Sequence, residues 1–186
     1  DKTIYDLIEN IYDTRIEELL EKNEIAFLNS GLDSFQISDL DEYKIISTTL
    51  NEAKVKEGIK DFLTFNKQIE KFGFLNSELD LAKKNYLRNI EQNIINRETR
   101  SSKSFANEYQ RHFLDDEMIS SSEDELKFTK EIMPSITVKD LNDYFKNYIK
   151  AKNQIIQINA PSYIKNLPDE AEIKELYAEV ENKDIE

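Results

Sequence analysis

The fold of this chain is decided by residues 72–117, FGFLNSELDLAKKNYLRNIEQNIINRETRSSKSFANEYQRHFLDDE. From Leu79 onward, apolar side chains recur at steps of three and four residues, which is the period of a helix with one buried face. This pattern lapses at residues 97–102, where charged and hydroxyl side chains gather, and it resumes at Phe105. The stretch therefore predicts two consecutive amphipathic helices separated by a kink or a short loop.

Aromatic residues stand at helical spacing within these two apolar stripes. Packing in a core is their expected role, and the alternative is an apolar wall that receives substrate side chains. The residues concerned are Tyr86, Phe105, Tyr109 and Phe113.

Local signals mark where this helical pair begins. Gly73 can adopt the left-handed conformation that ends a preceding helix, because it lacks a Cβ atom. Ser77 followed by Asp80 has the spacing of a capping pair. We therefore expect the first helix of the pair to begin near Glu78.

Two further helices are expected upstream of this stretch. Apolar periodicity predicts one over residues 4–22, with Thr3 and Asp6 as its capping pair. The same period predicts another over residues 53–71. Because a sheet and a helix each bury one face, the second helix is expected to lie on the strands that precede it.

Between these helices the sequence favours extended structure. Alternating apolar and polar side chains predict segments of an antiparallel sheet at residues 25–28, 34–38 and 42–49. Gly31 is expected to interrupt the first as a bulge or bend. Residues 39–41 are polar and short enough for a hairpin turn.

Two more helices are expected downstream. A run of three serines followed by acidic residues predicts a capped helix over residues 123–133, which Pro134 stops. Thr137 and Asp140 form a second capping pair, which predicts a helix over residues 138–150.

The end of the chain combines one more strand and one more helix. Residues 154–159, QIIQIN, are β-branched at three positions and predict a strand that returns to the early hairpin. Residues 169–181 predict a helix. The fold class is therefore α+β, an antiparallel sheet of few strands covered by long helices, with a C-terminal linker helix. We expect an αβ domain over residues 1–160 and an acidic linker over residues 161–186.

Composition excludes several classes of function. The chain has 38 acidic against 25 basic residues and a formal net charge of -13, which disfavours binding to nucleic acid and to anionic membranes. It contains no apolar run long enough to insert into a membrane and no signal-peptide core. Because it opens on Asp1 and not on a methionine, we expect a piece of a longer polypeptide, with the αβ domain incomplete at its N-terminus.

Motifs for common chemistries are also absent from the sequence. There is no cysteine, no P-loop, no dinucleotide-binding glycine motif and no nucleophile elbow. Acidic pairs such as Asp115 and Asp116 are expected from composition alone, and none has the spacing of a calcium-binding loop.

The order and spacing of four segments resemble a known family. They are similar to the second domain of pitrilysin/insulinase-type (inverzincin) zinc metallopeptidases, and more narrowly to the N-terminal half of bacterial two-halved members, before the linker. The segments are GFLNSELDLAKKNYLRNIEQ (73–92), ANEYQRHFLDDEMI (106–119), IMPSITVKDLNDYFKNYI (132–149) and LPDEAEIKELYAEVE (167–181).

The catalytic signature of that family, H-x-x-E-H on a helix, is absent. Its two histidines ligate zinc, and its glutamate acts as general base on the metal-bound water. Here the only histidine is His112, and aspartates stand where the pattern needs glutamate and histidine. We expect no catalytic, cofactor-binding or metal-ligating residue in this chain. His112 is interpreted as a half-buried helix residue on the same face as Phe105.

Arg15 is the one candidate for substrate binding. In the family, an arginine in the corresponding helix and a tyrosine seven residues later contact substrate in the C-terminal halves. Here the seventh residue is Lys22, and Phe27 is the nearest downstream aromatic. The alternative interpretation is a partly exposed arginine that pairs with Glu18 along its own helix.

The resemblance implies a noncatalytic, chamber-forming domain of a zinc metalloendopeptidase. The parent protein would be the enzyme, with zinc in its catalytic domain, and the partners of this chain would be the remaining domains and a peptide substrate. The alternatives are an inert structural or assembly subunit of the same fold, or a protein-interaction module. A bacterial periplasm or cytoplasm is compatible with the resemblance, and localisation is otherwise open.

Overall fold

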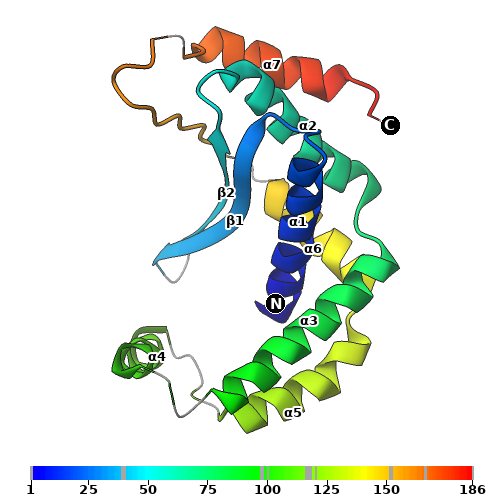
Figure 1. Cartoon of the computed structure of the whole chain (residues 1–186), viewed down its shortest axis with the longest axis vertical. Helices are drawn as coiled ribbons and strands as arrows, with labels where there is room; N and C mark the ends of the chain where they lie inside the picture. Colours follow the sequence, from blue (N-terminus) through cyan, green and yellow to red (C-terminus); the bar gives the residue numbers. More distant parts are fainter. Residues whose placement is uncertain are drawn as a thin grey trace. The chain divides into compact units, whose positions relative to one another are not determined.

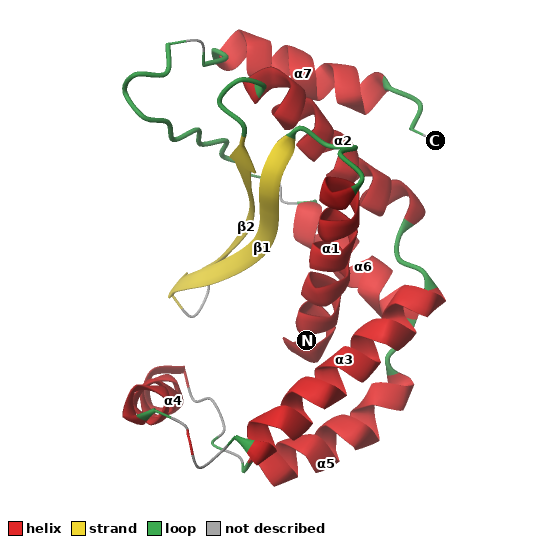
Figure 2. Cartoon of the chain, in the orientation of Figure 1, coloured by secondary structure: helices red, strands yellow, loops and turns green. Residues whose placement is uncertain are grey.

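The computed structural model describes residues 2–38, 41–96, 99, 101–115, 119, 121–150, 153–165 and 167–185. The chain divides into two compact units, one of Asp1–Leu75 with Val138–Glu186 and one of Asn76–Thr137. The elements of the first unit are α1 (Lys2–Glu21), β1 (Phe27–Ser38), β2 (Asp41–Leu50), α2 (Val55–Phe72), α6 (Val138–Ile149) and α7 (Glu170–Asn182) (Figures 1 and 2). Those of the second are α3 (Asn76–Ile95), α4 (Ser102–Asp115), α5 (Ser122–Ile132) and the short 3₁₀ turn η2 (Met133–Ser135).

The sheet of the first unit is a long antiparallel hairpin of β1 and β2. The predicted segment 34–38 and the second half of the predicted segment 25–28 belong to one continuous strand, β1, while Ile25 and Ala26 precede it. The bulge predicted at Gly31 is wrong, because Gly31 stays in register opposite Ser47. The irregularities lie near the two ends of β1 instead. Of the predicted turn at 39–41, the first two residues lie outside the described residues.

The sequence predicted a strand at residues 154–159, and this prediction is wrong. In the part of the chain that the structure describes, these residues belong to no strand. These residues form no ladder, and the sheet contains β1 and β2 alone. The sequence pattern is that of a strand, but a strand exists only when a neighbour accepts its backbone hydrogen bonds. The described residues supply no such neighbour to this segment.

The core of the first unit forms where helices cover the hairpin. α1 and α2 pack against β1, and α6 packs against α1 (Figure 1). Aromatic rings link the layers: Phe27 of β1 meets Phe65 of α2 at 6.2 Å between centroids, and Phe65 meets Tyr12 of α1 at 5.0 Å. The fully buried side chains at this centre are Leu7, Ile8, Tyr12, Phe27, Ile69, Leu141 and Phe145.

Gly73 ends α2, as the sequence predicted. Its φ of 72° and ψ of -156° lie in a region that only glycine occupies readily, and its N–H donates to the carbonyl oxygen of Ile69 at 2.8 Å. A Cβ atom here would stand 2.5 Å from Oδ1 of Asn142. That same oxygen accepts the N–H of Phe74 at 2.9 Å. The chain therefore leaves α2 through a position that has no room for a side chain.

The second unit is built on α3 and α5, which pack against each other. Lys83 of α3 donates to the carbonyl oxygen of Ile136 at 2.6 Å, just beyond η2. The serine cap predicted for α5 is confirmed, since the Ser121 hydroxyl accepts the N–H of Asp124 at 3.0 Å. The cap predicted at Ser77 is wrong, because α3 begins at Asn76 and places Ser77 inside its first turn. Thr3 likewise lies within α1 and not before it.

α4 carries a stripe that the sequence predicted to be core. None of its described side chains is buried, so that expectation is wrong for Phe105, Tyr109 and Phe113. Phe113 is 85% exposed. Helical periodicity identified the stripe correctly but could not show whether a neighbouring element covers it.

The α+β class with few antiparallel strands and long covering helices is confirmed. Among the described residues, none of the helices has the length and apolar character required to cross a membrane.

Gly73→Ala is expected to lower the free energy of unfolding by about 2 kcal/mol or more, through backbone strain and the clash with Asn142. Chemical denaturation followed by circular dichroism measures the change. Gly31→Ala is the matched control, because a Cβ atom there meets nothing within 4 Å. Equal stability of the two variants would contradict the role assigned to Gly73.

Candidate functional site

Arg15 reaches from α1 to the segment that follows α2. Its Nη2 donates to the carbonyl oxygen of Gly73 at 2.9 Å, and its guanidinium lies 5.3 Å from the ring centroid of Phe74. Both contacts use the planar, permanently charged group that arginine offers for stacking and hydrogen bonding. Arg15 therefore fixes the exit of α2, a contact between distant segments that helix periodicity does not reveal.

The contacts of Arg15 compete with the substrate role inferred from the resemblance. A guanidinium that holds a backbone carbonyl and an aromatic ring has fewer donors left for a peptide. Lys22, seven residues on, lies just beyond the end of α1 at Glu21 and supplies no aromatic ring. Substrate binding by Arg15 stays a prediction, and its observed contacts are structural.

His112 is exposed on α4, so the prediction that it is half-buried is wrong. Asp116 lies outside the described residues. Within the ranges that the structure describes, no group of three or more His, Cys, Asp or Glu side chains is arranged to hold a metal ion. A catalytic zinc needs three protein ligands, which are mostly histidine in sites without cysteine. With one histidine and no cysteine, the residues present do not fit a catalytic zinc.

Tyrosine hydroxyls from two helices hold the middle of the hairpin. The hydroxyl of Tyr148 on α6 donates to the carbonyl oxygens of Asp33 and Ile45, the latter at 2.9 Å, and accepts the N–H of Asp33 at 3.1 Å. The hydroxyl of Tyr5 on α1 donates to the carbonyl oxygen of Leu32 at 2.9 Å. These contacts tie neighbouring residues of β1 to two different helices.

A third tyrosine, Tyr12, joins the hairpin to α2. Its hydroxyl lies 2.9 Å from Oγ of Ser30 and 3.1 Å from Oδ1 of Asn66. Ser30 in turn donates to the carbonyl oxygen of Ser47 at 2.8 Å, so the chain of bonds crosses from α1 through both strands. Since buried polar groups are costly when unpaired, this network selects one position for the hairpin.

Burial keeps these three hydroxyls protonated. Burial raises the pKa of Tyr12 to about 12 and that of Tyr148 to about 12. In each case the hydrogen bonds of the hydroxyl lower the pKa, but by less than burial raises it. Burial also raises the pKa of Tyr5, and Glu9 adds to the shift. The three side chains therefore stay neutral hydroxyls, able to donate hydrogen bonds, to a higher pH than an exposed tyrosine.

The hairpin presents an aromatic pair to solvent. The rings of Phe35 and Tyr43 stack at 5.2 Å with an interplanar angle of 13°, and each side chain is nearly half exposed. Nearby, Nζ of Lys44 lies 5.8 Å from the ring centroid of Tyr144 and 5.5 Å from that of Tyr148. Because successive side chains of a strand point to opposite faces, Lys44 lies on the side of α6, and the rings of Phe35 and Tyr43 lie on the other face. Exposed apolar rings are a surface on which an extended polypeptide can rest its side chains.

An acidic stripe runs along α1. Asp6, Glu9, Asp13 and Glu17 follow at steps of three and four residues and so share one face. Burial raises the pKa of Glu9, and Asp13, Asp6 and then Asp33 raise it further. Burial also raises the pKa of Asp13, with Glu17 adding to the shift. Ionisation of Glu9 and Asp13 at neutral pH therefore lowers the free energy of unfolding.

α7 docks on α2 through lysines. Lys56 pairs with Glu172 and Lys60 with Glu179. The Nζ of Lys67 donates to the carbonyl oxygen of Val180 at 2.8 Å. The side chains of Ile173 and Val180 are buried beneath these polar contacts. The sequence carries part of this signal, because lysines at positions 56, 60, 67 and 71 share one helical face.

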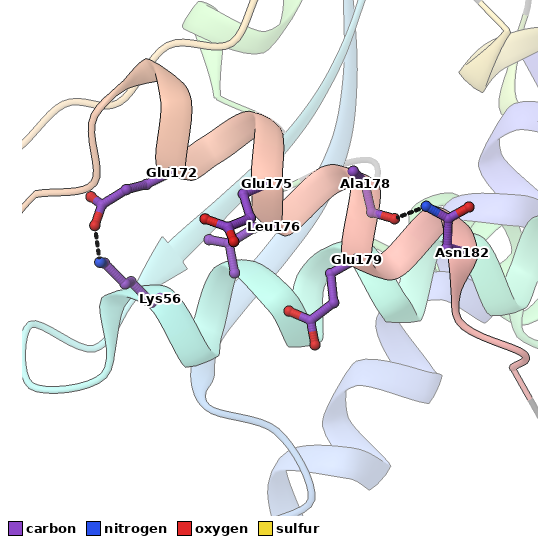
Figure 3. Close-up of a pocket in the computed structure, with 7 residues that line it drawn as sticks. All are labelled: Lys56, Glu172, Glu175, Leu176, Ala178, Glu179 and Asn182. Atoms are coloured by element: carbon purple, nitrogen blue, oxygen red, sulfur yellow. Dashed lines mark hydrogen bonds and ion pairs between the residues drawn. The ribbon is translucent and has the colours of Figure 1, made fainter.

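A hollow of about 370 Å³ lies along this contact and is shown in Figure 3. Glu172 reaches Lys56 across it, while Leu176 and Glu179 project from α7 toward α2. Three of its seven lining residues are acidic. Two of them are in ion pairs, Glu172 with Lys56 and Glu179 with Lys60. The hollow is a space between paired surface side chains and has no catalytic arrangement.

No family model matches the sequence, and no curated protein matches it. Solved structures do match the fold. The periplasmic protease PqqL from Escherichia coli aligns with 98% of this chain at a TM-score of 0.81 and 16% identity, and the first half of that protein aligns with 98% at 0.80 and 16%. A predicted insulinase family protease from Yersinia pestis aligns with 95% at 0.71 and 13% identity.

The chain has the fold of an insulinase-like protease domain. It spans 20% of PqqL, 40% of the first half of PqqL and 38% of the Yersinia pestis protein. At these identities the likeness concerns the fold and does not transfer residue roles. The fold expected from the four sequence segments is therefore confirmed.

Glu9→Gln is expected to raise the free energy of unfolding at pH 7 by about 0.5 kcal/mol, the scale of a like-charge pair on a helix. Folding raises the pKa of Glu9, so the folded state favours the protonated carboxyl. The stability that this preference provides is fully present below the unfolded pKa and is lost as the pH rises through the folded pKa. The advantage of the variant should therefore shrink as the pH falls toward 4. Thermal melts at several pH values measure it.

The exposed Glu24→Gln, which makes the same change in net charge, is the control for this series. An equal gain in that variant would assign the effect to the overall charge of the protein and not to the stripe on α1.

Lys67→Met is expected to loosen α7, because it removes a mostly buried cation from the last carbonyl groups of that helix. Loss of a charged hydrogen bond of about 1.5 kcal/mol should make the amides of α7 exchange roughly tenfold faster with deuterium. Lys174→Met removes only an exposed ion pair with Glu170 and should leave exchange nearly unchanged. Similar rates in both variants would contradict the docking role of Lys67.

Proposed function

We propose that this chain is a noncatalytic domain of a zinc metalloendopeptidase of the pitrilysin/insulinase type, the second domain of the N-terminal half of a bacterial two-halved enzyme. In this proposal it forms part of the wall of a chamber that receives a peptide. Zinc and the residues that cleave the peptide bond belong to another domain of the same protein.

The alignment with the first half of PqqL carries this proposal. It extends over 98% of the chain, so the likeness includes both units and the C-terminal helix. The match leaves the larger part of that half without a counterpart here. A domain that forms one part of a larger protease half accounts for both facts.

The residue set supports a noncatalytic role. One histidine and no cysteine cannot provide the three ligands of a catalytic zinc. The buried tyrosines keep their protons, and the raised pKa values of Glu9 and Asp13 arise on a helix face without a nucleophile or metal partner among the described residues. The chemistry available to this chain is therefore contact with a peptide and not its hydrolysis.

The hairpin gives the proposed wall a rigid peptide-facing surface. Three tyrosine hydroxyls fix its inner side, and the stacked rings of Phe35 and Tyr43 occupy its exposed side. Apolar rings held on a strand provide contact area with little loss of side-chain freedom on binding.

The test compares residues 1–186 alone with the longer protein from which they come. We expect stoichiometric zinc and peptide hydrolysis only in the longer protein, measured by elemental analysis and by cleavage of a fluorogenic peptide. Stoichiometric zinc or steady hydrolysis by residues 1–186 alone would overturn the proposal. A longer protein without zinc or activity would support the inert assembly subunit instead.

A second arm of the same test addresses the chamber wall. Tyr43→Ala in the longer protein should raise KM for peptide cleavage several-fold and leave the zinc content and kcat nearly unchanged. Phe128→Ala, which truncates an exposed ring of α5, is the control. An unchanged KM in Tyr43→Ala would remove the hairpin face from the peptide path.

A further inference from the structure

Three tyrosine rings, which we call the ring cluster, meet where α1 and α6 approach the hairpin. The ring centroid of Tyr5 on α1 lies 6.4 Å from that of Tyr144 and 6.3 Å from that of Tyr148, both on α6. The centroids of Tyr144 and Tyr148 lie 6.5 Å apart. Because the face of an aromatic ring carries partial negative charge, a cluster of this kind attracts a cation.

A cation from the same chain already lies on the ring cluster. The Nζ atom of Lys44 is 5.8 Å from the ring centroid of Tyr144 and 5.5 Å from that of Tyr148. The Lys44 side chain is exposed, and no carboxylate among the described residues forms an ion pair with it. An exposed contact of this kind is weak, because water solvates an ammonium group strongly. The ammonium of Lys44 is therefore an occupant that another cation can replace.

Carboxylates flank the ring cluster. Glu9 follows Tyr5 by four residues on α1, so the two side chains are neighbours on one face of the helix. Burial raises the pKa of Tyr5, and the charges of Glu9 and Asp33 raise it further. Burial also raises the pKa of Glu9, with Asp13, Asp6 and Asp33 adding to the shift, and Glu9 has no cationic partner among the described residues. The negative charge beside the rings is therefore largely uncompensated.

We propose that the ring cluster binds an arginine side chain of a peptide, whose guanidinium displaces the ammonium of Lys44 from the rings and lies beside the carboxylate of Glu9. This inference rests on the proposed function, in which the chain contacts a peptide, and it names the class of peptide. Lys44 then acts as an internal competitor, which leaves the rings when a better cation arrives.

Shape and charge favour arginine as the occupant. A guanidinium is planar and less strongly hydrated than an ammonium, so it can stack on a ring and still donate hydrogen bonds to a carboxylate. A metal ion is disfavoured, because no group of three or more acidic or histidine side chains in the described ranges is arranged to hold one. The formal net charge of -13 adds a long-range attraction for basic peptides.

The experiment measures peptide binding by fluorescence anisotropy, so it does not depend on hydrolysis. One labelled peptide carries a central arginine, and its matched control carries citrulline, which has nearly the same shape without the charge. Both are titrated with residues 1–186 and with the longer protein after zinc is chelated, so that the peptides stay intact. The arginine peptide should bind roughly tenfold more tightly, the scale of one charged hydrogen bond and a cation–π contact. Equal affinities for the two peptides would overturn the inference.

Lys44→Met distinguishes an internal competitor from a residue that holds the peptide. Because the competing ammonium is gone, the arginine peptide should bind about threefold more tightly, the scale of an exposed cation–π contact. The affinity for the citrulline peptide should stay nearly the same. Lys174→Met, which makes the same change in net charge at an exposed ion pair on α7, is the matched control and should change neither affinity appreciably. An unchanged or weaker affinity of Lys44→Met for the arginine peptide would overturn the inference.

Tyr144→Leu removes one ring of the cluster and keeps an apolar side chain. The preference for arginine over citrulline should fall to nearly none in this variant. Tyr163→Leu, at a 65% exposed position, is the control and should keep the preference. A melting temperature shows whether Tyr144→Leu folds, and the exposed Lys44→Met tests the inference where it does not. A full preference in folded Tyr144→Leu would contradict binding at the ring cluster.

The inference and the proposed function fail in different ways. Peptide hydrolysis by the longer protein, together with equal affinities for the two peptides, would reject arginine binding and keep the proposed function. Arginine-selective binding by a longer protein that holds no zinc and cleaves no peptide would reject the proposed function. The ring cluster would then remain a binding site for basic peptides in a protein that is not a protease.

Discussion

The hydrogen bonds from three tyrosine hydroxyls to the hairpin are the constraint on which the rest of the structure depends. Two strands alone have little tendency to keep one shape in water. Here Tyr5 and Tyr12 reach the hairpin from α1, and Tyr148 reaches it from α6. Because these hydroxyls are buried and stay protonated, displacing the hairpin would leave several polar groups unpaired at once. The position of the hairpin, and with it the exposed ring pair of Phe35 and Tyr43, follows from this.

Most helices were predictable from sequence because helical periodicity is a local signal. Gly73 ends α2 and Ser121 caps α5 as predicted, whereas the caps predicted at Thr3 and Ser77 lie inside α1 and α3. Signals that depend on a distant neighbour were not predictable. Residues 154–159 have the composition of a strand, yet the described chain offers them no ladder. α4 has an apolar stripe, and none of its described side chains is buried.

In the candidate site, too, features of composition could be interpreted from the sequence, and contacts between distant residues could not. The expectation that this chain holds no catalytic zinc rests on its composition of one histidine and no cysteine, and it stays a prediction. The contact of Arg15 with Gly73 and Phe74 could not be predicted, because it joins residues far apart in the sequence. The fold likeness to insulinase-like proteases agrees with the order of the sequence segments, while identities of 16% or less leave individual roles to experiment.

The first unit is discontinuous in sequence, and this has a consequence for how the protein is made. α1 buries side chains against α6, yet all of Asn76–Thr137 is synthesised between them. Contacts between distant segments form late, because a long loop must close before they yield any stabilisation. A ribosome-bound chain that ends before Val138 therefore exposes the apolar face of α1, and this nascent intermediate is the stage at which chaperones and aggregation compete for the protein.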